Sequence, residues 1–210
     1  MNEKIIKGYN LLKWGIILTA LHINLNIKIG GVVVGIQIIP AFIGCFIIFA
    51  AINLMYKAGG ERYFSLLKKE SVTLLILSIA QFVAGVLFAY SDVISVRDIV
   101  SPAFIMALYL YELLVYSDIL NMTVRLYKDN KEIKRADKLR KDRIFLLKAG
   151  LAISLVYLLN MVPKLSVFLG YATITLTLGL KLWITMLLQN VTRTSVTFKK
   201  DDNTMVDNED

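Results

Sequence analysis

The sequence predicts an all-α fold, a polytopic transmembrane helical bundle with six spans and with both termini in the cytoplasm. Of the 210 residues, 57% are hydrophobic and 19% are charged, whereas soluble domains average roughly 45–50% and about 25%. The mean hydropathy is +0.63. The apolar residues form six long runs, and most cations lie between alternate runs. Lipid is therefore the expected surrounding of most of this chain.

Each apolar run approaches the roughly 20 helical residues that cross a hydrocarbon core of about 30 Å. The spans must be helical because lipid offers no partner for unpaired backbone groups. Together they form a six-helix transmembrane domain over residues 1–190. The predicted spans are 11–25, 38–56, 71–90, 101–118, 144–162 and 167–188.

The first run follows a basic start with Lys4, Lys7 and Lys13, as in a signal sequence, but no small-x-small cleavage site follows it. We interpret it as an uncleaved first helix. Residues 24–37 alternate polar and apolar side chains around a Gly30-Gly31 pair. This pattern indicates a short hairpin, lying flat on the membrane, with an irregular return into the second span as the alternative.

Helix-breaking residues and charged side chains predict where the remaining segments begin and end. Pro40 suits the first turn of the second span. Residues 61–70 mix aromatic, aliphatic and basic side chains, which predicts a short amphipathic helix at the lipid headgroups. Residues 125–143 form a basic cytoplasmic connector with helical i, i+4 charge pairs. Residues 191–210 are polar and end in acidic side chains, which predicts a disordered cytoplasmic tail.

The distribution of cations predicts the orientation. Nineteen Lys and Arg residues lie on the side of the N-terminus, and only Lys28, Arg97 and Lys164 lie on the other. Cytoplasmic loops of membrane proteins carry such an excess. The net charge of +8 is then explained by attraction of the basic loops to anionic lipids. We expect no nucleic-acid partner, because residues 125–143 have no aromatic side chain beyond Tyr127 on which bases could stack.

Glu112 is the residue of greatest interest, because a carboxylate inside a span costs about 2.5–3.5 kcal/mol on insertion scales. Counted from the cytoplasmic ends of their spans, Glu112 and Lys181 lie at the same depth, roughly 10 Å at 1.5 Å per residue. We expect these two residues to form an ion pair, with Lys148 as the alternative partner. Tyr109, three residues from Glu112, is a candidate hydrogen-bond donor to the carboxylate, and Gln81 is a further polar residue within a span.

Composition argues against an enzyme. The chain has one cysteine, Cys45, and one histidine, His22, which leaves no disulfide and no cysteine or histidine cluster for a metal. It also lacks the phosphate-binding glycine loop, the zinc-protease motif and the nucleophile elbow. We expect no catalytic residue, no metal and no cofactor.

Two short motifs carry a resemblance to a known group of proteins. His22-Ile-Asn-Leu followed by Ile38-Ile-Pro-Ala-Phe-Ile-Gly44 resembles a pattern in small uncharacterised multi-pass proteins of bacterial cytoplasmic membranes. Those proteins have acidic residues where this chain has His22 and Ala41, and their intervening loop is shorter. The resemblance implies a bacterial inner-membrane location and brings no known activity.

Two functions fit these observations. The first is a noncatalytic integral membrane protein that acts as an accessory or interaction subunit, with residues 125–143 docking a protein partner. The second is a small transporter or channel, as a homodimer, with a polar path around Gln81, Glu112 and Lys181. The second predicts a cavity that reaches Glu112, and the first predicts a dry interior there.

Overall fold

The computed structural model describes residues 3–21, 24–29, 32–37, 40–59, 61–89, 101–159 and 166–206. These residues form six helices and one two-stranded antiparallel sheet. The elements, in chain order, are α1 (Glu3–Ala20), β1 (Asn24–Ile29), β2 (Val32–Gln37), α2 (Ala41–Gly59), α3 (Glu61–Ala89), α4 (Ser101–Asp129), α5 (Ile133–Leu159) and α6 (Ser166–Val206).

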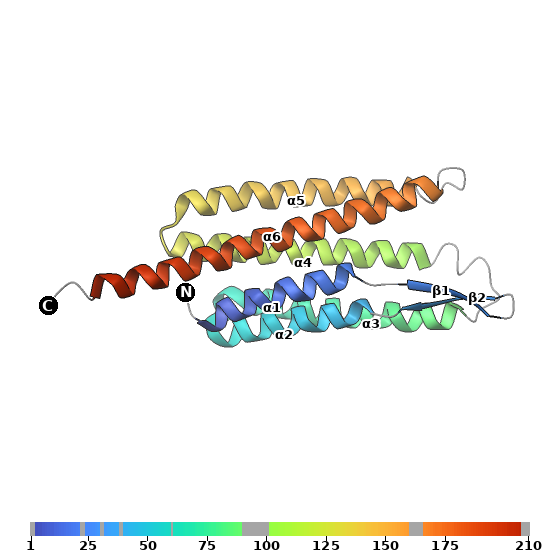
Figure 1. Cartoon of the computed structure of the whole chain (residues 1–210), viewed down its shortest axis with the longest axis horizontal. Coiled ribbons are helices and arrows are strands. Elements are labelled where there is room, and N and C mark those ends of the chain that lie inside the picture. Colours follow the sequence, from blue (N-terminus) through green and yellow to red (C-terminus); the bar gives the residue numbers. More distant parts are fainter. Residues whose placement is uncertain are drawn as a thin grey trace.

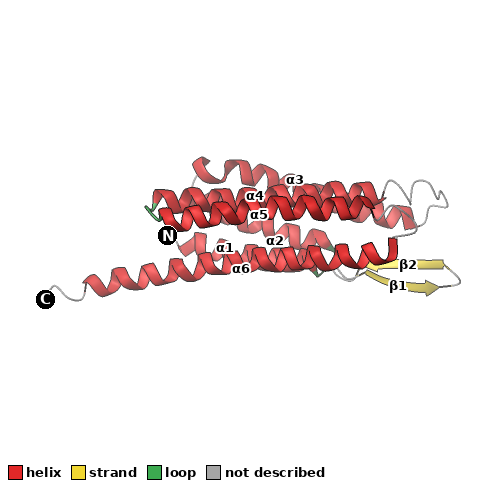
Figure 2. Cartoon of the chain, turned by 90° about the horizontal axis from the view of Figure 1, so that it is seen from above, coloured by secondary structure: helices red, strands yellow, loops and turns green. Residues whose placement is uncertain are grey.

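The six helices run roughly parallel to one axis and alternate in direction (Figures 1 and 2). Each helix packs against the next one in the chain, and α6 also packs against α1. The helices therefore close into a ring. The core inside this ring is built from buried side chains such as Tyr9, Ile48, Leu74, Leu120 and Ile184.

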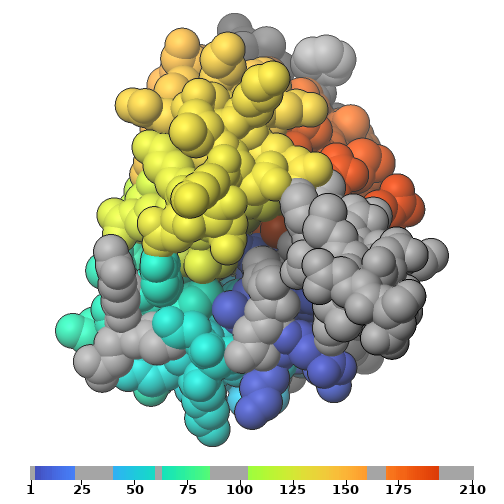
Figure 3. Space-filling view, turned by 90° about the vertical axis from the view of Figure 1, so that its left-hand side faces the viewer, coloured from blue at the N-terminus to red at the C-terminus, as the bar shows by residue number. Residues whose placement is uncertain are grey.

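The two ends of the bundle differ in charge and structure. At one end α1 begins, α2 meets α3, α4 meets α5 and α6 extends beyond the other helices (Figure 1). This end carries the basic connector between α4 and α5, and we call it the basic end. Figure 3 views the basic end, where the α4–α5 connection lies above α1, α2 and α3. We call the opposite end, which carries β1 and β2, the hairpin end.

The predicted hairpin is present, with Asn24 paired to Gln37 and Ile29 to Val32. Its strands run along the bundle axis (Figures 1 and 2), where we expected a hairpin lying across the membrane surface. The reason is that α1 ends at Ala20 and α2 begins at Ala41, so both helices stop short of the hairpin end. The predicted span 11–25 thus extends too far, because Asn24 and Leu25 belong to β1.

Three helical stretches are long and apolar enough to cross a membrane, namely Ala41–Gly59, Phe104–Asp129 and Leu169–Arg193. Large apolar side chains also face outward along the ring. Every one of the six helices exposes at least one, and the examples are Trp14, Phe46, Ile76, Leu114, Leu155 and Ile174. A soluble protein seldom exposes so many large apolar side chains, so these features indicate a membrane protein.

The structure differs from the predicted elements in two places near the basic end. Residues 61–70, expected as a separate surface helix, form the first turns of α3. Residues 191–206, expected as a disordered tail, continue α6. No Gly or Pro interrupts the chain after Gly179, and Val191 and Thr192 are buried, so the helix keeps both its backbone hydrogen bonds and its packing there.

The basic connector is a helical hairpin. The predicted helical character of residues 125–143 is present, since α4 continues to Asp129 and α5 starts at Ile133. Lys131 lies in the turn between them with a φ of 62°. The backbone N–H of Glu132 donates to the carbonyl of Tyr127, which closes the C-terminus of α4.

Helices α1 and α2 approach each other closely through glycines. A Cβ on Gly44 would lie 2.6 Å from the backbone nitrogen of Thr19 and 2.7 Å from the carbonyl oxygen of Gly15. Small residues allow such backbone contact between membrane helices. The contact holds the last turn of α1 against the first turns of α2, which is where the buried polar residues lie.

Candidate functional site in the central cavity

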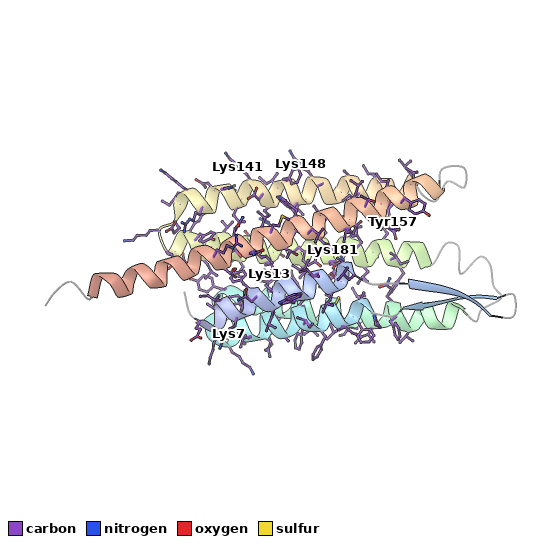
Figure 4. All side chains as sticks on the ribbon, viewed as in Figure 1. Lys7, Lys13, Lys141, Lys148, Tyr157 and Lys181 are labelled. Carbon is purple, nitrogen blue, oxygen red and sulfur yellow. The ribbon has the colours of Figure 1, made fainter. Side chains whose placement is uncertain are left out.

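The predicted ion pair between Glu112 and Lys181 is present inside the ring. The Nζ atom of Lys181, on α6, lies 2.8 Å from Oε1 of Glu112, on α4. Each residue is only 7% exposed. Figure 4 shows Lys181 in the interior between α6 and α1. The buried carboxylate of Glu112 is thus in direct contact with the ammonium group of Lys181, which compensates its charge.

Lys181 also binds the end of α1. Its Nζ lies 3.2 Å from Oγ1 of Thr19 and 3.3 Å from the carbonyl oxygen of Thr19. The last carbonyls of a helix have no partner within the helix, and a lysine near a helix C-terminus also interacts favourably with the helix dipole. An ammonium group has three N–H donors. Glu112 and the two oxygens of Thr19 use all three.

Tyr116 is the tyrosine that binds the carboxylate. Its hydroxyl donates to Oε1 of Glu112, the oxygen that also accepts from Lys181. Oγ1 of Thr19 lies 3.2 Å from the same hydroxyl. We expected Tyr109 as the donor, but a position four residues along the helix brings Tyr116 over Glu112. The hydroxyl of Tyr109 has no hydrogen-bond partner among the described residues.

Lys148 does not take part in this pair. It is exposed on α5, and Figure 4 shows it pointing away from the bundle. A lysine on an outer helix face can extend its ammonium group toward the headgroups. The alternative partner for Glu112 is therefore not used in this structure.

A cavity of about 470 Å³ ends on the ion pair. All six helices contribute to its lining. Polar groups come from Thr19, Gln81, Tyr109, Tyr157, Thr173 and Thr177, in addition to Glu112 and Lys181. The apolar part of the wall is formed by side chains such as Ile105, Leu108 and Leu178. Small-molecule sites in proteins have volumes of about 300–1,000 Å³ and a similar mixture of apolar walls with a few polar groups.

The cavity exists because two of the six helices are short. Ala20 and Ala41, the last residue of α1 and the first residue of α2, both line it. Toward the basic end the interior is filled by fully buried side chains, among them Leu12, Ile16, Ile119 and Leu188. The ion pair therefore lies between a hollow half and a packed half of the bundle.

A second polar cluster lies at the basic end, where α3, α4 and α5 meet. Arg143 is 3.5 Å from a carboxylate oxygen of Asp118 and donates to Ser117 and Asn121. Glu70 faces the same aspartate. Burial and the neighbouring charge of Asp118 raise the pKa of Glu70 from 4.5 to about 7. Oε2 of Glu70 is buried without a donor, so a proton on this carboxyl group is needed to hydrogen-bond Asp118.

Some of these residues are predictable from the sequence and others are not. Gln81, Tyr109, Glu112 and Lys181 all line the cavity, as the predicted polar path requires. Thr19 was missed, because nothing in the sequence marks the end of a helix as a lysine partner. Of the two short motifs that carry the resemblance, His22, Ile23, Ile38 and Ile39 lie outside the described residues. Among the described residues, no group of three or more His, Cys, Asp or Glu side chains is placed to hold a metal.

Comparison of the chain with protein-family models, with curated proteins and with solved structures gives no match. The assignment of a function therefore depends on the geometry of the site alone.

Proposed function

We propose that this protein is a small membrane transporter or channel whose central cavity binds a small solute. The observation that carries the proposal is the cavity of about 470 Å³ that ends on the Glu112–Lys181 pair. A carboxylate and an ammonium group placed only to pin two helices would be surrounded by packed side chains. Polar and ionisable residues inside membrane spans are instead frequent in substrate and ion pathways.

The proposal includes six membrane crossings, with both termini and the basic end in the cytoplasm of a bacterial cell. The outward-facing apolar side chains on all six helices support six crossings. The nineteen cations on the N-terminal side support the orientation. In this orientation the hollow half of the bundle faces the outside, and the packed half closes the path toward the cytoplasm.

Cysteine accessibility tests this proposal. In a background where Cys45 is replaced by Ala, Thr177→Cys places a thiol in the cavity, and Leu182→Cys places one on an exposed position of the same helix that does not line the cavity. A charged, membrane-impermeant thiol reagent applied to intact cells needs water to reach its target. We expect it to label Thr177→Cys and to leave Leu182→Cys unlabelled.

Labelling of neither position would contradict a water-filled cavity that opens outward. Equal labelling of both would mean that α6 is surrounded by water and does not face lipid. Labelling of Thr177→Cys only in inside-out vesicles would leave the cavity intact and reverse the proposed orientation.

A second candidate function is that of an accessory subunit that docks a protein partner. It is supported by the ordered helical hairpin of the connector, which exposes Arg125, Lys128, Lys134, Lys138 and Lys141. Recovery of a stoichiometric partner from detergent extracts, lost when these five residues are replaced by Gln, would favour it. Unchanged labelling of Thr177→Cys in the same variant would show that docking and the cavity are separate properties.

A further inference from the structure

We propose that a groove between α2 and α3 at the basic end binds one anionic phospholipid, with the phosphate group at Lys68 and Lys69 and one acyl chain along α3. The inference rests on the membrane crossing of α3 that the proposed function includes, and it is independent of the central cavity. In the proposed orientation the groove faces the cytoplasmic leaflet, where anionic lipids give the membrane surface a negative potential.

The groove has a volume of about 580 Å³ and lies where α2 and α3 pack side by side (Figure 1). Tyr56 of α2 forms one wall. The other wall is formed by residues of α3, namely Ser65, Lys68, Lys69 and Val72. Two ammonium groups, a hydroxyl group and an aromatic ring therefore meet in one open groove.

Both lysines keep their charge available for a ligand. Nζ of Lys68 lies 4.3 Å from the ring centroid of Tyr56, and attraction between the ammonium and the ring holds it in the groove. An aromatic ring, unlike a carboxylate, does not neutralise this charge. Among the described residues, no carboxylate forms a salt bridge with Lys68 or Lys69. Adjacent ammonium groups of this kind suit an anion, and lysine is a common ligand of phosphate groups in proteins.

Two carboxylates of this end are engaged by other residues. Glu70 of α3 faces Asp118, and Asp129 accepts a hydrogen bond from Tyr63. None of the described residues that line the groove is acidic. A zwitterionic headgroup would bring a further cation beside the two lysines without a carboxylate to receive it. The charges of the groove therefore favour an anionic headgroup.

The same face of α3 is apolar beyond the lysines. Val72, Ile76, Ile79 and Val83 are all exposed, and their spacing of three or four residues places them in one stripe along the helix. From Val72 to Val83 the stripe measures about 16 Å at 1.5 Å per residue. One leaflet is half of a hydrocarbon core of about 30 Å, so an acyl chain matches the stripe when the phosphate lies at the lysines. A free phosphate would leave this stripe unused, which favours a phospholipid as the ligand.

Native mass spectrometry of the purified full-length chain in detergent tests the site, because bound lipids are counted from the mass. The probes are phosphatidylglycerol and phosphatidylcholine with identical acyl chains. We expect one phosphatidylglycerol per chain to bind at least about tenfold more tightly than phosphatidylcholine, since each lysine close to anionic lipid contributes roughly fivefold. Glycerol phosphate, which has the phosphate but no acyl chain, is expected to leave this lipid bound even in large excess.

Two double variants with the same loss of charge locate the effect. Lys68→Gln/Lys69→Gln is expected to lower the affinity for phosphatidylglycerol to that for phosphatidylcholine. The matched control Lys138→Gln/Lys141→Gln removes two exposed cations of the connector that do not line the groove, and it is expected to keep the preference. All four lysines are at least partly exposed, so neither variant removes a fully buried side chain.

Equal affinity of the native chain for the two lipids would overturn this inference. An equal loss of affinity in both double variants would do so as well, because the lipid would then respond to the charge of the whole basic end. Displacement of phosphatidylglycerol by glycerol phosphate would assign the groove to a soluble phosphate compound. If one of these results is found while Thr177→Cys is labelled in cells, the inference is wrong and the water-filled cavity stands. If the lipid preference depends on Lys68 and Lys69 but Thr177→Cys is not labelled, the lipid site stands and the proposed solute path is wrong.

Discussion

Glu112 and Lys181 illustrate how two isolated ionisable residues become one buried unit. Burying either charge alone inside the bundle would cost free energy. Each charge is stabilised by a partner from a distant part of the chain. Tyr116 and Thr19 add further hydrogen bonds to the two charges. Such hydrogen bonds offset part of the cost of removing a charged pair from water.

This coupling predicts a specific pattern of stability. Glu112→Gln or Lys181→Met alone leaves one buried charge unpaired, which costs about 3–5 kcal/mol. The double variant Glu112→Gln/Lys181→Met leaves no charge and is expected to be more stable than either single variant. Thermal unfolding of the purified protein in detergent measures this. Additive losses in the double variant would show that the two residues do not stabilise each other.

Glu70 predicts how stability depends on pH. Its pKa is raised from 4.5 to about 7 by burial and by Asp118, which is itself bound by Arg143. Between these two pH values the folded protein holds a proton that the unfolded chain has lost. The free energy of unfolding is therefore expected to fall as the pH rises from 4.5 to about 7.

The variant Glu70→Gln tests this assignment, because Gln keeps a donor toward Asp118 at every pH. We expect the variant to be more stable than the native protein above about pH 7 and to lack the decrease below it. Unfolding temperatures measured across this range provide the comparison. The same decrease in both proteins would assign the pH dependence to another group.

At the scale of elements, the length of α1 and α2 determines the site. Both helices stop near Thr19 and Ala41, and the other four continue past them toward the hairpin end. The cavity is the space that the two short helices leave. The close contact at Gly44 holds Thr19 at the position where its oxygens bind Lys181.

A methyl group at Gly44 is therefore expected to disturb the site. In Gly44→Ala the new Cβ would meet backbone atoms of Thr19 and Gly15 at less than 3 Å, so α1 must shift. The matched control is Gly179→Ala, where nothing lies within 4 Å of the new Cβ and a stronger helix former replaces Gly. We expect a lower unfolding temperature only for Gly44→Ala. Equal stability of both variants would mean that α1 and α2 are not in backbone contact.

At the scale of the whole molecule, the closed ring explains how a short chain encloses a polar site. Each helix packs on its neighbours, and α6 packs on α1, so polar groups are collected inside and large apolar side chains face outward. α6 is 41 residues long, about 60 Å at 1.5 Å per residue. It therefore extends well beyond a hydrocarbon core of about 30 Å, on the side of the basic end.

The proposed orientation predicts where the chain is open to proteases. The exposed Lys and Arg residues of the α4–α5 connector are suitable sites for trypsin. We expect cleavage within residues 125–143 in inside-out vesicles and protection in intact cells. A tag at the N-terminus identifies the fragment by its size. Cleavage in intact cells would reverse the orientation proposed from the cations.

The sequence by itself predicted the all-α class, the six long helices and the matched positions of the two charges along their helices. These are properties of local pattern, because apolar run length and the spacing of residues along a helix can be counted directly. The matched depths of Glu112 and Lys181 predicted their contact, and the alternation around Gly30-Gly31 predicted the hairpin.

Only the tertiary structure decided which tyrosine binds the carboxylate, that Thr19 completes the partners of the lysine, and that a cavity lies beside them. Tyr109 and Tyr116 are seven residues apart and lie on the same face of α4. The choice between them depends on what each one meets: Tyr116 lies beside Thr19 of α1, and Tyr109 lines the cavity. The cavity depends on where α1 and α2 end relative to four other helices. Such relations arise from packing between segments far apart in the chain, which local sequence patterns do not encode.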